Sequence, residues 1–572
     1  MPSLKYIHFR YLRSHSSWLV KIMGTESKPE EKRRDFLKTV GAGVVGLAVG
    51  AVAGYGVSAS MVPPAPPGGV VTATVTETVT AAGPAVARVA GATAKERALN
   101  GVKALQAAGK IPAGTRLATY YYAGSKGTIT ATQKEWEDST GIALDLVEVP
   151  VELAYDKIMM EATAKTGTPD VFITQYRQTG DLARAKVIAE LTDWVYKYDP
   201  VLHGAPFGYI YPVDLQEATY AGKIWAMPID CDTQTFYYRK DLLQSPREQE
   251  AFERQYGYPL PVKGAETWDQ YLDMIEHFHR PPDMYGTYEH RSLYWSWMCW
   301  TARYTCKKFP VNYYFDDDMN PLIASPDGVK AIEQYVATIP FQDPDWPTIT
   351  WAEAYPRMAS GKGFVYYSFP SFAKYANTPE VSKVVGKILY ADPPGEYVDT
   401  PSGKKLLRSN SMFGGWSAFV NAYSRNTELA YLYTQWAFSP ENMPLVSTDP
   451  GSFADPSRYV QVYDPRQVGP EGSGKFPIEY MQGTTGSAVD GYVHRTSISA
   501  PDVLMEGGPE MYNIIDKYLS SACHNEISAA DAAQTTAAEW TKVIERLGRD
   551  HMKEVNKWFK TVYPMDVLGI VP

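Results

Sequence analysis

Strand-like and helix-like segments alternate along the chain from Thr115 onward, and this order constrains the fold more than any other feature. The β-rich runs lie at 117–121, 142–149 and 170–174, and the helical segments between them end near 139 and span 152–165. Gly141 stands just after the first helical segment, where a left-handed residue commonly ends a helix. Such alternation with short loops predicts an α/β fold in which a parallel sheet carries helices on both faces. Ligands on such sheets bind at the carboxyl ends of the strands.

A second feature is the segment 222–243, GKIWAMPIDCDTQTFYYRKDLL, which joins two β-rich runs through a short acidic and amide-bearing gap. This pattern suits a backbone that leaves one sheet and enters another. The segment resembles the first inter-lobe crossover of the extracellular solute-binding proteins of ABC importers (family 1, the maltose-binding-protein-like group). Residues 361–369 and 413–420 resemble a strand and the return crossover of that family. The resemblance covers the chain from Thr115 to about Leu547.

The resemblance implies a two-lobed, periplasmic-binding-protein-like fold of type II. Each lobe would be a mainly parallel sheet flanked by helices, with a hinge between the lobes. The expected division is residues 112–234 and 411–488 for the first lobe, and 235–410 and 489–572 for the second. The chain is expected to cross between them near 230–235, 411–416 and 486–492.

The function that the resemblance implies is capture of a carbohydrate, an oligosaccharide in particular, in the cleft between the lobes. The protein would then deliver this ligand to the permease subunits of an ABC importer in the membrane. We expect a monomer that has no catalytic residues, no cofactor and no metal.

The N-terminus carries the pattern of an export signal. The run RRDFLK at 33–38 matches the core of twin-arginine signals, and a glycine-rich apolar span at 40–57 precedes a small-residue cleavage site. That order is typical of a signal peptide. We expect residues 1–59 to be a signal that is cleaved or kept as an anchor, with translation starting at Met1 or Met23. Residues 60–111 have the composition of a Pro- and Thr-rich stalk and a short helix. The protein is expected on the extracellular face of the cytoplasmic membrane.

Charge and cysteine content narrow the classes of partner. The 572-residue chain has a formal net charge of −9, so neither nucleic acid nor an anionic membrane surface is an expected partner. Its four cysteines do not form a disulfide framework. Cys299 and Cys306 are near enough in sequence to form a bridge, and both the bridged and the free state remain open.

Three local patterns approach a ligand-binding motif and lack a required residue. Residues 469–476 have phosphate-loop spacing, but Phe476 replaces the metal-binding Ser or Thr. Residues 316–320 have calcium-loop spacing, but Pro321 stands where the loop needs glycine. The two histidines at 277–279 lie on different helix faces without further ligands at metal spacing. These patterns therefore predict a surface loop, a turn and solvated or core histidines.

The candidate ligand-binding residues stand where a strand or a crossover opens into the expected cleft. Aromatic rings can cover the apolar face of a sugar, while carboxylates and amides accept its hydroxyl protons. Asp232 is the favoured acidic residue, and Arg177 and Gln178 are the favoured donors. Trp295, Trp297 and Trp300 are interpreted as core. The complete set of candidates is Tyr122, Tyr176, Arg177, Gln178, Asp230, Asp232, Phe369 and Trp416.

Two other functions remain open at the level of the sequence. An exported glycoside hydrolase would also use paired carboxylates and aromatic rings, although nothing in the crossover pairs Asp230 or Asp232 with a second carboxylate. A ligand-sensing surface protein would use the same fold, because fold alone does not determine function.

Overall fold

The computed structural model describes residues 88–198, 201–202, 205–206, 218–310, 313–411, 415–449, 451–458, 461, 498–500 and 502–562. The export signal, most of the stalk, the phosphate-loop-like residues 469–476 and the third crossover at 486–492 lie outside these residues. Within the described part of the chain, no helix has both the length and the hydropathy needed to cross a membrane.

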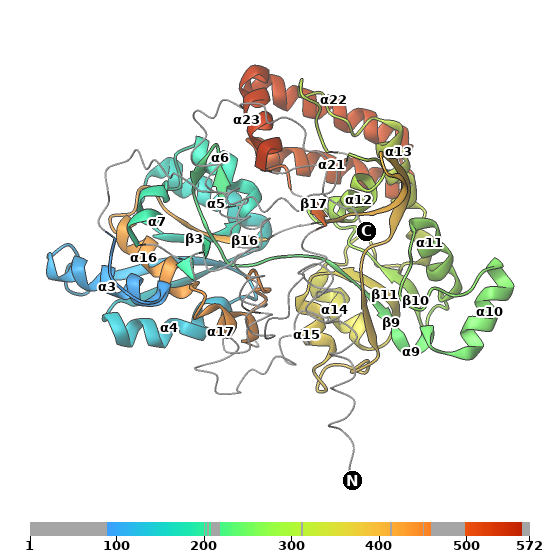
Figure 1. Ribbon diagram of the computed structural model, residues 1–572, viewed down its shortest axis with the longest axis horizontal. Helices are drawn as coiled ribbons and strands as arrows, with labels where there is room; N and C mark the ends of the chain where they lie inside the picture. The colour runs from blue at the N-terminus through green and yellow to red at the C-terminus, as the bar shows by residue number, and fades with distance from the viewer. Residues whose placement is uncertain are drawn as a thin grey trace, which may run out of the picture.

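The first sheet has the strand order β2-β1-β3-β16-β8, and Figure 1 labels its strands β3 and β16. Its strands are β1 (Arg116–Tyr122), β2 (Ala143–Val149), β3 (Val171–Gln175), β8 (Met227–Pro228) and β16 (Trp416–Val420). Strands β1, β2 and β3 are parallel, whereas β16 runs antiparallel to both of its neighbours. Helices α4 (Gly127–Thr140) and α5 (Val151–Ala164) connect the parallel strands. The predicted alternation is confirmed, and Gly141 ends α4 in the left-handed conformation, with φ 71°.

The second sheet has the order β10-β11-β9-β12. Its strands are β9 (Thr235–Arg239), β10 (Tyr285–Tyr288), β11 (Gly363–Ser368) and β12 (Ile388–Ala391). Strand β9 runs antiparallel to both neighbours, and β10 pairs in parallel with β11. The helices around this sheet include α11 (Trp268–His277), α14 (Trp351–Ala359) and α15 (Ser371–Ala376). Thr267 caps the N-terminus of α11, because its side chain accepts the Gln270 N–H.

The chain leaves the first sheet at β8 and enters the second at β9, so residues 229–234 form a crossover where the sequence pattern indicated one. It returns through β15 (Asn410–Ser411) to β16. The two sheets and their helices lie side by side in Figure 1. We refer to the part around the first sheet as the first lobe and to the part around the second sheet as the second lobe. The outer limits of the lobes remain a prediction.

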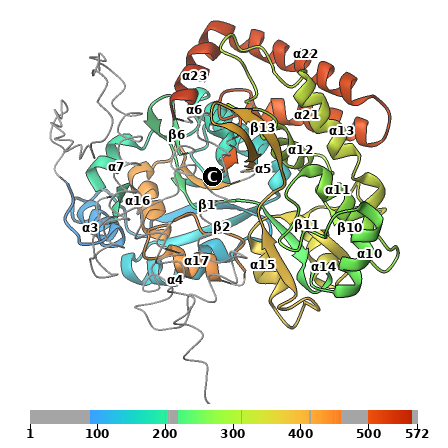
Figure 2. The same cartoon turned by 45° about the vertical axis from the view of Figure 1, so that its right-hand side comes forward.

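The C-terminal helices pack on the second lobe beside α12 (Ser296–Thr305) and α13 (Pro326–Val336), as Figures 1 and 2 both show. They are α21 (Gly508–Cys523), α22 (Ala529–Leu547) and α23 (Arg549–Val562). The Trp297 ring stacks on Tyr512 of α21 with centroids 4.0 Å apart. Trp297 and Trp300 are almost fully buried, which confirms their interpretation as core residues.

Helix α3 (Ala94–Ala107) lies directly after the stalk segment and packs against α16 (Thr427–Ala437) of the first lobe. Ala98 and Val102 are fully buried there. The remaining elements are η1 (Tyr176–Gln178), α6 (Thr179–Arg184), α7 (Thr192–Tyr198), β4 (Val201–Leu202), β5 (Ala205–Pro206), β6 (Thr219–Tyr220), β7 (Lys223–Ile224), α9 (Lys240–Leu243), α10 (Pro246–Tyr256), η2 (Ile339–Phe341), β13 (Gly395–Thr400), β14 (Gly403–Arg408), α17 (Met443–Thr448) and β17 (Ser499–Ala500).

All four cysteines are free and buried, so Cys299 and Cys306 form no bridge. The Cys306 sulfur instead accepts a hydrogen bond from the Trp268 indole at 3.4 Å. Burial raises the pKa of the Cys306 thiol to about 11, which keeps it in the unreactive thiol form. Residues 316–320 form the predicted turn, in which the Asp316 carboxylate accepts backbone N–H groups from Asp318 and Asn320.

Candidate ligand-binding cleft

A cavity of about 40 Å³ lies between the two lobes, at the edges where their strands end. The first lobe contributes the last residue of β1, the first residues of α5 and β16, and a loop that follows α17. The second lobe contributes residues from α14, α15 and the end of β11, and the crossover runs along one side. The lining residues are Tyr122, Val151, Asp230, Asp232, Trp295, Trp351, Tyr355, Phe369, Ser371, Trp416 and Phe453.

Five of the eight predicted site residues line this cavity, and they come from both lobes. On the first lobe, the Tyr122 ring stacks on Trp416 with centroids 3.9 Å apart and planes 23° apart. On the second lobe, Phe369 packs edge-on against Trp295 with centroids 5.8 Å apart. Asp230 and Asp232 complete the set from the crossover. These positions agree with the rule that ligands bind at the carboxyl ends of strands, because Tyr122 ends β1 and Phe369 follows β11.

The other three predicted residues, Tyr176, Arg177 and Gln178, do not line the cavity. They form the short helix η1, whose side chains turn into the protein. Arg177 is 3 % exposed, and its guanidinium lies 4.6 Å from the ring centre of Tyr294 and 5.0 Å from that of Tyr512. Cation–π contacts of this kind are strongest when the cation is desolvated. Arg177 therefore has a structural place between the first lobe and α21.

Tyr176 lies against the return crossover at Gly415. A Cβ atom added to Gly415 would lie 2.4 Å from Cε1 of the Tyr176 ring and 3.1 Å from the Asp230 carbonyl oxygen. Only glycine allows this approach. Gln178 is held by Thr174, whose hydroxyl donates to the Gln178 side-chain oxygen at 2.9 Å.

Several cavity residues were absent from the predicted set. Trp351 and Tyr355 lie one turn apart on α14, and the capping box of Thr350 and Glu353 begins this helix. The T-x-x-E pattern was the sequence signal that would have placed Trp351 at a helix start. Trp295, interpreted as core, is 5 % exposed and also lines the cavity. Val151, Ser371 and Phe453 carried no recognisable pattern.

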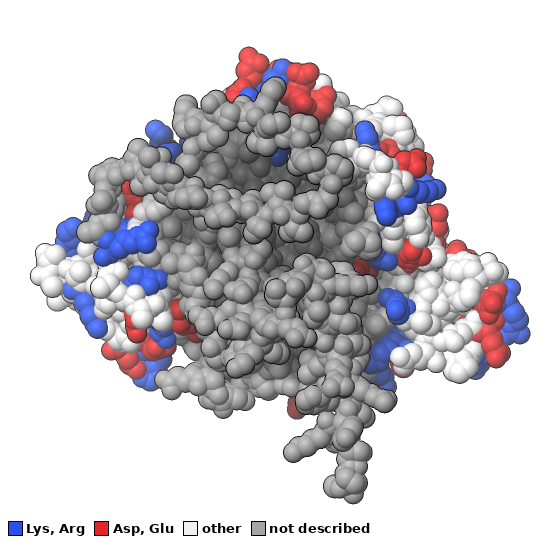
Figure 3. Space-filling view, in the orientation of Figure 1, with Lys and Arg blue, Asp and Glu red and all other residues white. Residues whose placement is uncertain are grey.

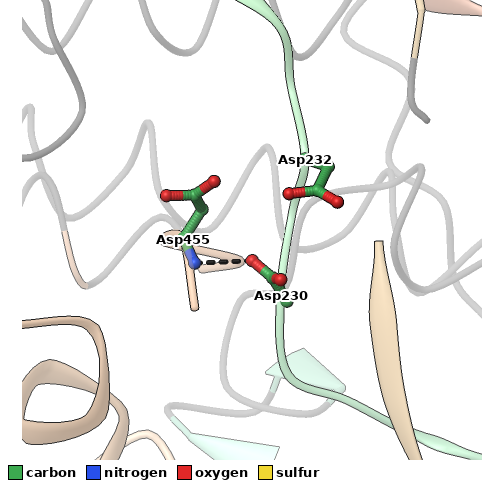
Figure 4. Close-up of side chains that lie close together, drawn as sticks. All are labelled: Asp230, Asp232 and Asp455. Atoms are coloured by element: carbon green, nitrogen blue, oxygen red, sulfur yellow. Dashed lines mark hydrogen bonds between the residues drawn. The ribbon is translucent and has the colours of Figure 1, made fainter. Parts of the chain in front are cut away.

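A cluster of three carboxylates lies at this cavity and is formed by Asp230, Asp232 and Asp455 (Figure 4). One oxygen of each lies within 4.8 Å of the others, and the three residues are at most 6 % exposed. The Asp455 backbone N–H donates to the Asp230 carboxylate at 2.5 Å. Burial raises the pKa of Asp230, and burial together with the charge of Asp230 raises the pKa of Asp455. The cluster therefore holds protons more tightly than exposed carboxylates do.

Lys374 on α15 is the basic side chain whose charge acts on Asp230 and Asp455. Its ammonium donates to the backbone carbonyls of Ser452, Asp449 and Ser447 at 2.6, 3.1 and 3.5 Å. Burial lowers the pKa of Lys374. Because α15 belongs to the second lobe, whereas Ser447 lies in α17 of the first lobe and Asp449 and Ser452 lie just after it, these bonds join the two lobes beside the cavity.

A hydrogen bond and a contact between two aromatic rings also join the lobes. The Tyr294 hydroxyl donates to the Gln175 side-chain oxygen at 2.5 Å, and the Trp351 and Phe453 rings meet edge-on with centroids 5.0 Å apart.

The cavity is small compared with the volume that a solute needs. A water molecule occupies about 10–15 Å³ of cavity volume, so this cavity of about 40 Å³ has room for only about three water molecules. Ligand pockets usually measure about 300–1,000 Å³. A larger solute therefore enters only when the two walls separate.

Comparison with known proteins adds a family match and a set of similar folds. The family model of the bacterial extracellular solute-binding proteins matches residues 122–444. The erythritol/L-threitol-binding protein of Mycolicibacterium smegmatis is 26 % identical over 342 residues, which cover 57 % of this chain and 66 % of that protein. A probable ABC transporter-binding protein of Deinococcus radiodurans is 26 % identical over 304 residues, which cover 52 % of this chain and 64 % of that protein. The chain thus spans slightly less than two thirds of the length of these curated relatives.

Solved structures show the same fold at low sequence identity. The maltose-bound MalE3 of T. maritima superposes with a TM-score of 0.61 at 18 % identity, covering 75 % of this chain and 100 % of that one. A solute-binding protein from Agrobacterium radiobacter in complex with ribitol gives a TM-score of 0.59 at 20 % identity, covering 75 % of this chain and 99 % of that one.

Proposed function

The chain belongs to the family of bacterial extracellular solute-binding proteins, and from this membership we propose that it captures a carbohydrate, a sugar or sugar alcohol, between its two lobes. The observation that carries this proposal is the composition of the cavity wall. Aromatic rings from both lobes face carboxylates from the crossover. A ring covers the apolar C–H face of a sugar, and a carboxylate accepts its hydroxyl protons.

Relatives support the choice of a polyhydroxylated solute. A curated relative is named for erythritol and L-threitol, and the superposable structures hold maltose and ribitol. These ligands share several adjacent hydroxyl groups. We therefore favour a sugar or a sugar alcohol, and an oligosaccharide remains within the proposed class.

We further propose that the protein is exported by the twin-arginine route, remains at the outer face of the cytoplasmic membrane and delivers its ligand to an ABC permease as a monomer. The RRDFLK run and the Pro- and Thr-rich segment support export and display. On the face shown in Figure 3, acidic and basic side chains are interspersed over the described surface of both lobes. With a formal net charge of −9, such a surface does not favour nucleic acid.

A glycoside hydrolase is less well supported by this site. A hydrolase places its two carboxyl groups on either side of the scissile bond. Asp230 and Asp232 instead stand two residues apart on one crossover. The Asp455 backbone N–H donates to the Asp230 carboxylate, so the three carboxyl groups gather in one place (Figure 4). A sensor function would use the same cavity and differs only in the partner that reads the bound state.

The proposal is tested by a thermal-shift screen of the purified chain against monosaccharides, sugar alcohols and oligosaccharides. A solute at a thousand times its Kd stabilises the folded state by about 4 kcal/mol. We expect at least one carbohydrate to raise the melting temperature in a saturable way, and Asp232→Asn to weaken that effect. A panel that leaves the melting temperature unchanged, or products released from the oligosaccharides, would contradict the proposal.

A further inference from the structure

We propose that the cleft is built for a carbohydrate that carries a protonated amino group, namely an amino sugar or an amino sugar alcohol. The inference rests on the proposed function and specifies the substrate class of the same site. It follows from the charge of the three-aspartate cluster, the bonding of Lys374 and the chemistry of the cavity walls.

The cluster gathers more buried acidic groups at the cavity than a neutral sugar requires, and a cation bound among them would favour their ionised forms. Asp230 and Asp232 line the cavity, and Figure 4 shows the Asp455 carboxylate beside Asp232. Asp455 is fully buried, and among the described residues neither of its carboxylate oxygens accepts a hydrogen bond from a group outside the cluster. Buried carboxylates are normally paired with a cation or with hydrogen-bond donors. Asp455 therefore points to a hydrogen-bonded positive group that the described residues do not supply.

Lys374 does not fill this role. A lysine ammonium has three N–H donors, and the three acceptors of Lys374 are backbone carbonyls at 447, 449 and 452. The positive charge of Lys374 can offset one negative charge of the cluster. None of its three hydrogen bonds goes to a carboxyl group of the cluster. Within the part of the chain that the structure describes, no lysine, arginine or histidine lines the cavity.

The walls favour an organic cation over a bare metal ion. A calcium ion takes six to eight oxygen ligands, and beyond the carboxylates the lining residues offer few side-chain oxygens, the hydroxyls of Tyr122, Tyr355 and Ser371. The rest of the wall consists mainly of aromatic rings, which include Trp295 and Trp351. Such rings attract an ammonium group through their faces. An ammonium would donate to Asp230 and Asp232 while the apolar face of the sugar packs on the rings.

The test compares matched pairs of solutes by calorimetric titration of the full chain at a series of pH values from about 6 to about 9, so that both the ammonium form of the solute and the ionised form of the cluster are sampled. The pairs are D-glucosamine with D-glucose, D-galactosamine with D-galactose, and 1-amino-1-deoxy-D-glucitol with D-glucitol, and N-acetyl-D-glucosamine serves as a neutral amide. We expect the amine of at least one pair to bind on the order of tenfold more tightly than its neutral partner, as charge-assisted hydrogen bonds are stronger than neutral ones. N-Acetylation should remove this advantage.

Variants link the preference to the cluster. Asp455→Asn replaces an ionisable carboxyl group by a neutral amide of nearly the same shape, so the ratio of amine affinity to neutral affinity should fall towards one. Asp318→Asn, on the exposed turn at 316–320, is the control and should keep the ratio of the wild type. If Asp455→Asn does not fold, as judged by its melting curve, Asp232→Asn provides the same comparison.

Each alternative outcome is distinct. Equal affinities within every pair would overturn the inference and leave carbohydrate capture intact. Failure of both series to bind would contradict the proposed function and the inference together. Affinity for neutral sugars that requires calcium chloride and is lost with EDTA would assign the cluster to a metal ion and overturn the inference.

Discussion

At the scale of single residues, the aromatic side chains of the cavity differ in what else they support. Phe369 is 6 % exposed and belongs to the main hydrophobic core, where it contacts Trp295 and His290. Removing its ring would cost folding stability as well as affinity, since truncating a buried phenylalanine to alanine typically costs about 3–5 kcal/mol. Trp351 is only partly buried and meets Phe453 across the cavity. A substitution at Trp351 should therefore affect carbohydrate affinity with less effect on folding stability than a substitution at Phe369.

We predict that Trp351→Ala weakens carbohydrate binding more than tenfold, which corresponds to the ~2 kcal/mol typical of an anchor residue. Its melting temperature without solute should change much less than that of Phe369→Ala. The control is Trp346→Ala, because Trp346 is also partly buried but packs on His524 at 4.8 Å and does not line the cavity. Calorimetric titration measures the carbohydrate affinity of Trp351→Ala and Trp346→Ala. Equal affinities of the two variants would show that Trp351 is not part of the binding site.

The three-aspartate cluster makes the stability of the solute-free protein depend on pH. Burial raises the pKa of Asp230 and Asp455 above that of the unfolded chain, so the folded state holds these protons more tightly. Their contribution to the free energy of unfolding is complete below the ordinary carboxyl pKa of about 4 and is lost as pH rises through the raised values. Tyr122, Asp232 and Lys374 are the other titratable groups at this cluster.

Asp230→Asn should therefore make the free energy of unfolding fall less steeply between pH about 4 and about 8 than it does in the wild type. Asp502 and Asp516, whose pKa values burial raises to about 8 and about 7, keep their contributions in both proteins. Urea unfolding at a series of pH values gives the comparison. Identical pH profiles would mean that Asp230 titrates as an ordinary carboxylate.

At the scale of elements, α14 brings two aromatic rings to the cavity because its N-terminus is fixed. The Thr350 side chain accepts the Ala352 N–H at 3.3 Å, and the Glu353 carboxylate accepts the Thr350 N–H at 2.9 Å. This capping box sets the first turn of α14 and hence the position of Trp351, its first residue.

Thr350→Ala should lower the free energy of unfolding by about 1 kcal/mol, the usual cost of losing an N-cap side chain. Thr350→Ser keeps the hydroxyl, so it should keep most of the free energy of unfolding that Thr350→Ala loses. Urea denaturation of the three proteins measures the effect, with carbohydrate affinity as a second readout. An alanine variant as stable as the wild type would show that the cap does not hold this helix.

The elements also show which parts of the fold and of the site could be predicted from the sequence and which could not. The alternation of strands and helices and the position of Gly141 after α4 depend on neighbours in the chain, so local patterns were sufficient to predict them. Asp455 reaches Asp230 across 225 positions through a loop without periodicity, so no local pattern marked it. Arg177 was predicted as a ligand donor, but α21 closes over it, and that packing depends on residues more than 300 positions away.

At the scale of the whole molecule, two sheets are joined by short crossovers and meet over a cavity that is too small for a sugar. Bonds from Lys374 and Tyr294, with the contact of Trp351 and Phe453, hold the lobes together in this arrangement. A solute that touches both walls stabilises the closed arrangement because only that arrangement makes both sets of contacts. Rotation about the crossovers would admit it, with few backbone dihedrals changing.

The most direct measurement of solute capture between the lobes is energy transfer between dyes placed on each of them. Thr130→Cys on α4 and Glu250→Cys on α10 are exposed positions on the first and second lobes, and the four native cysteines are buried. We predict that the carbohydrate raises transfer efficiency with the same half-saturation as in calorimetry, and that Trp351→Ala shifts this half-saturation to higher concentration. Calorimetric binding that leaves transfer efficiency unchanged would contradict the account, because the solute would then bind outside the cleft.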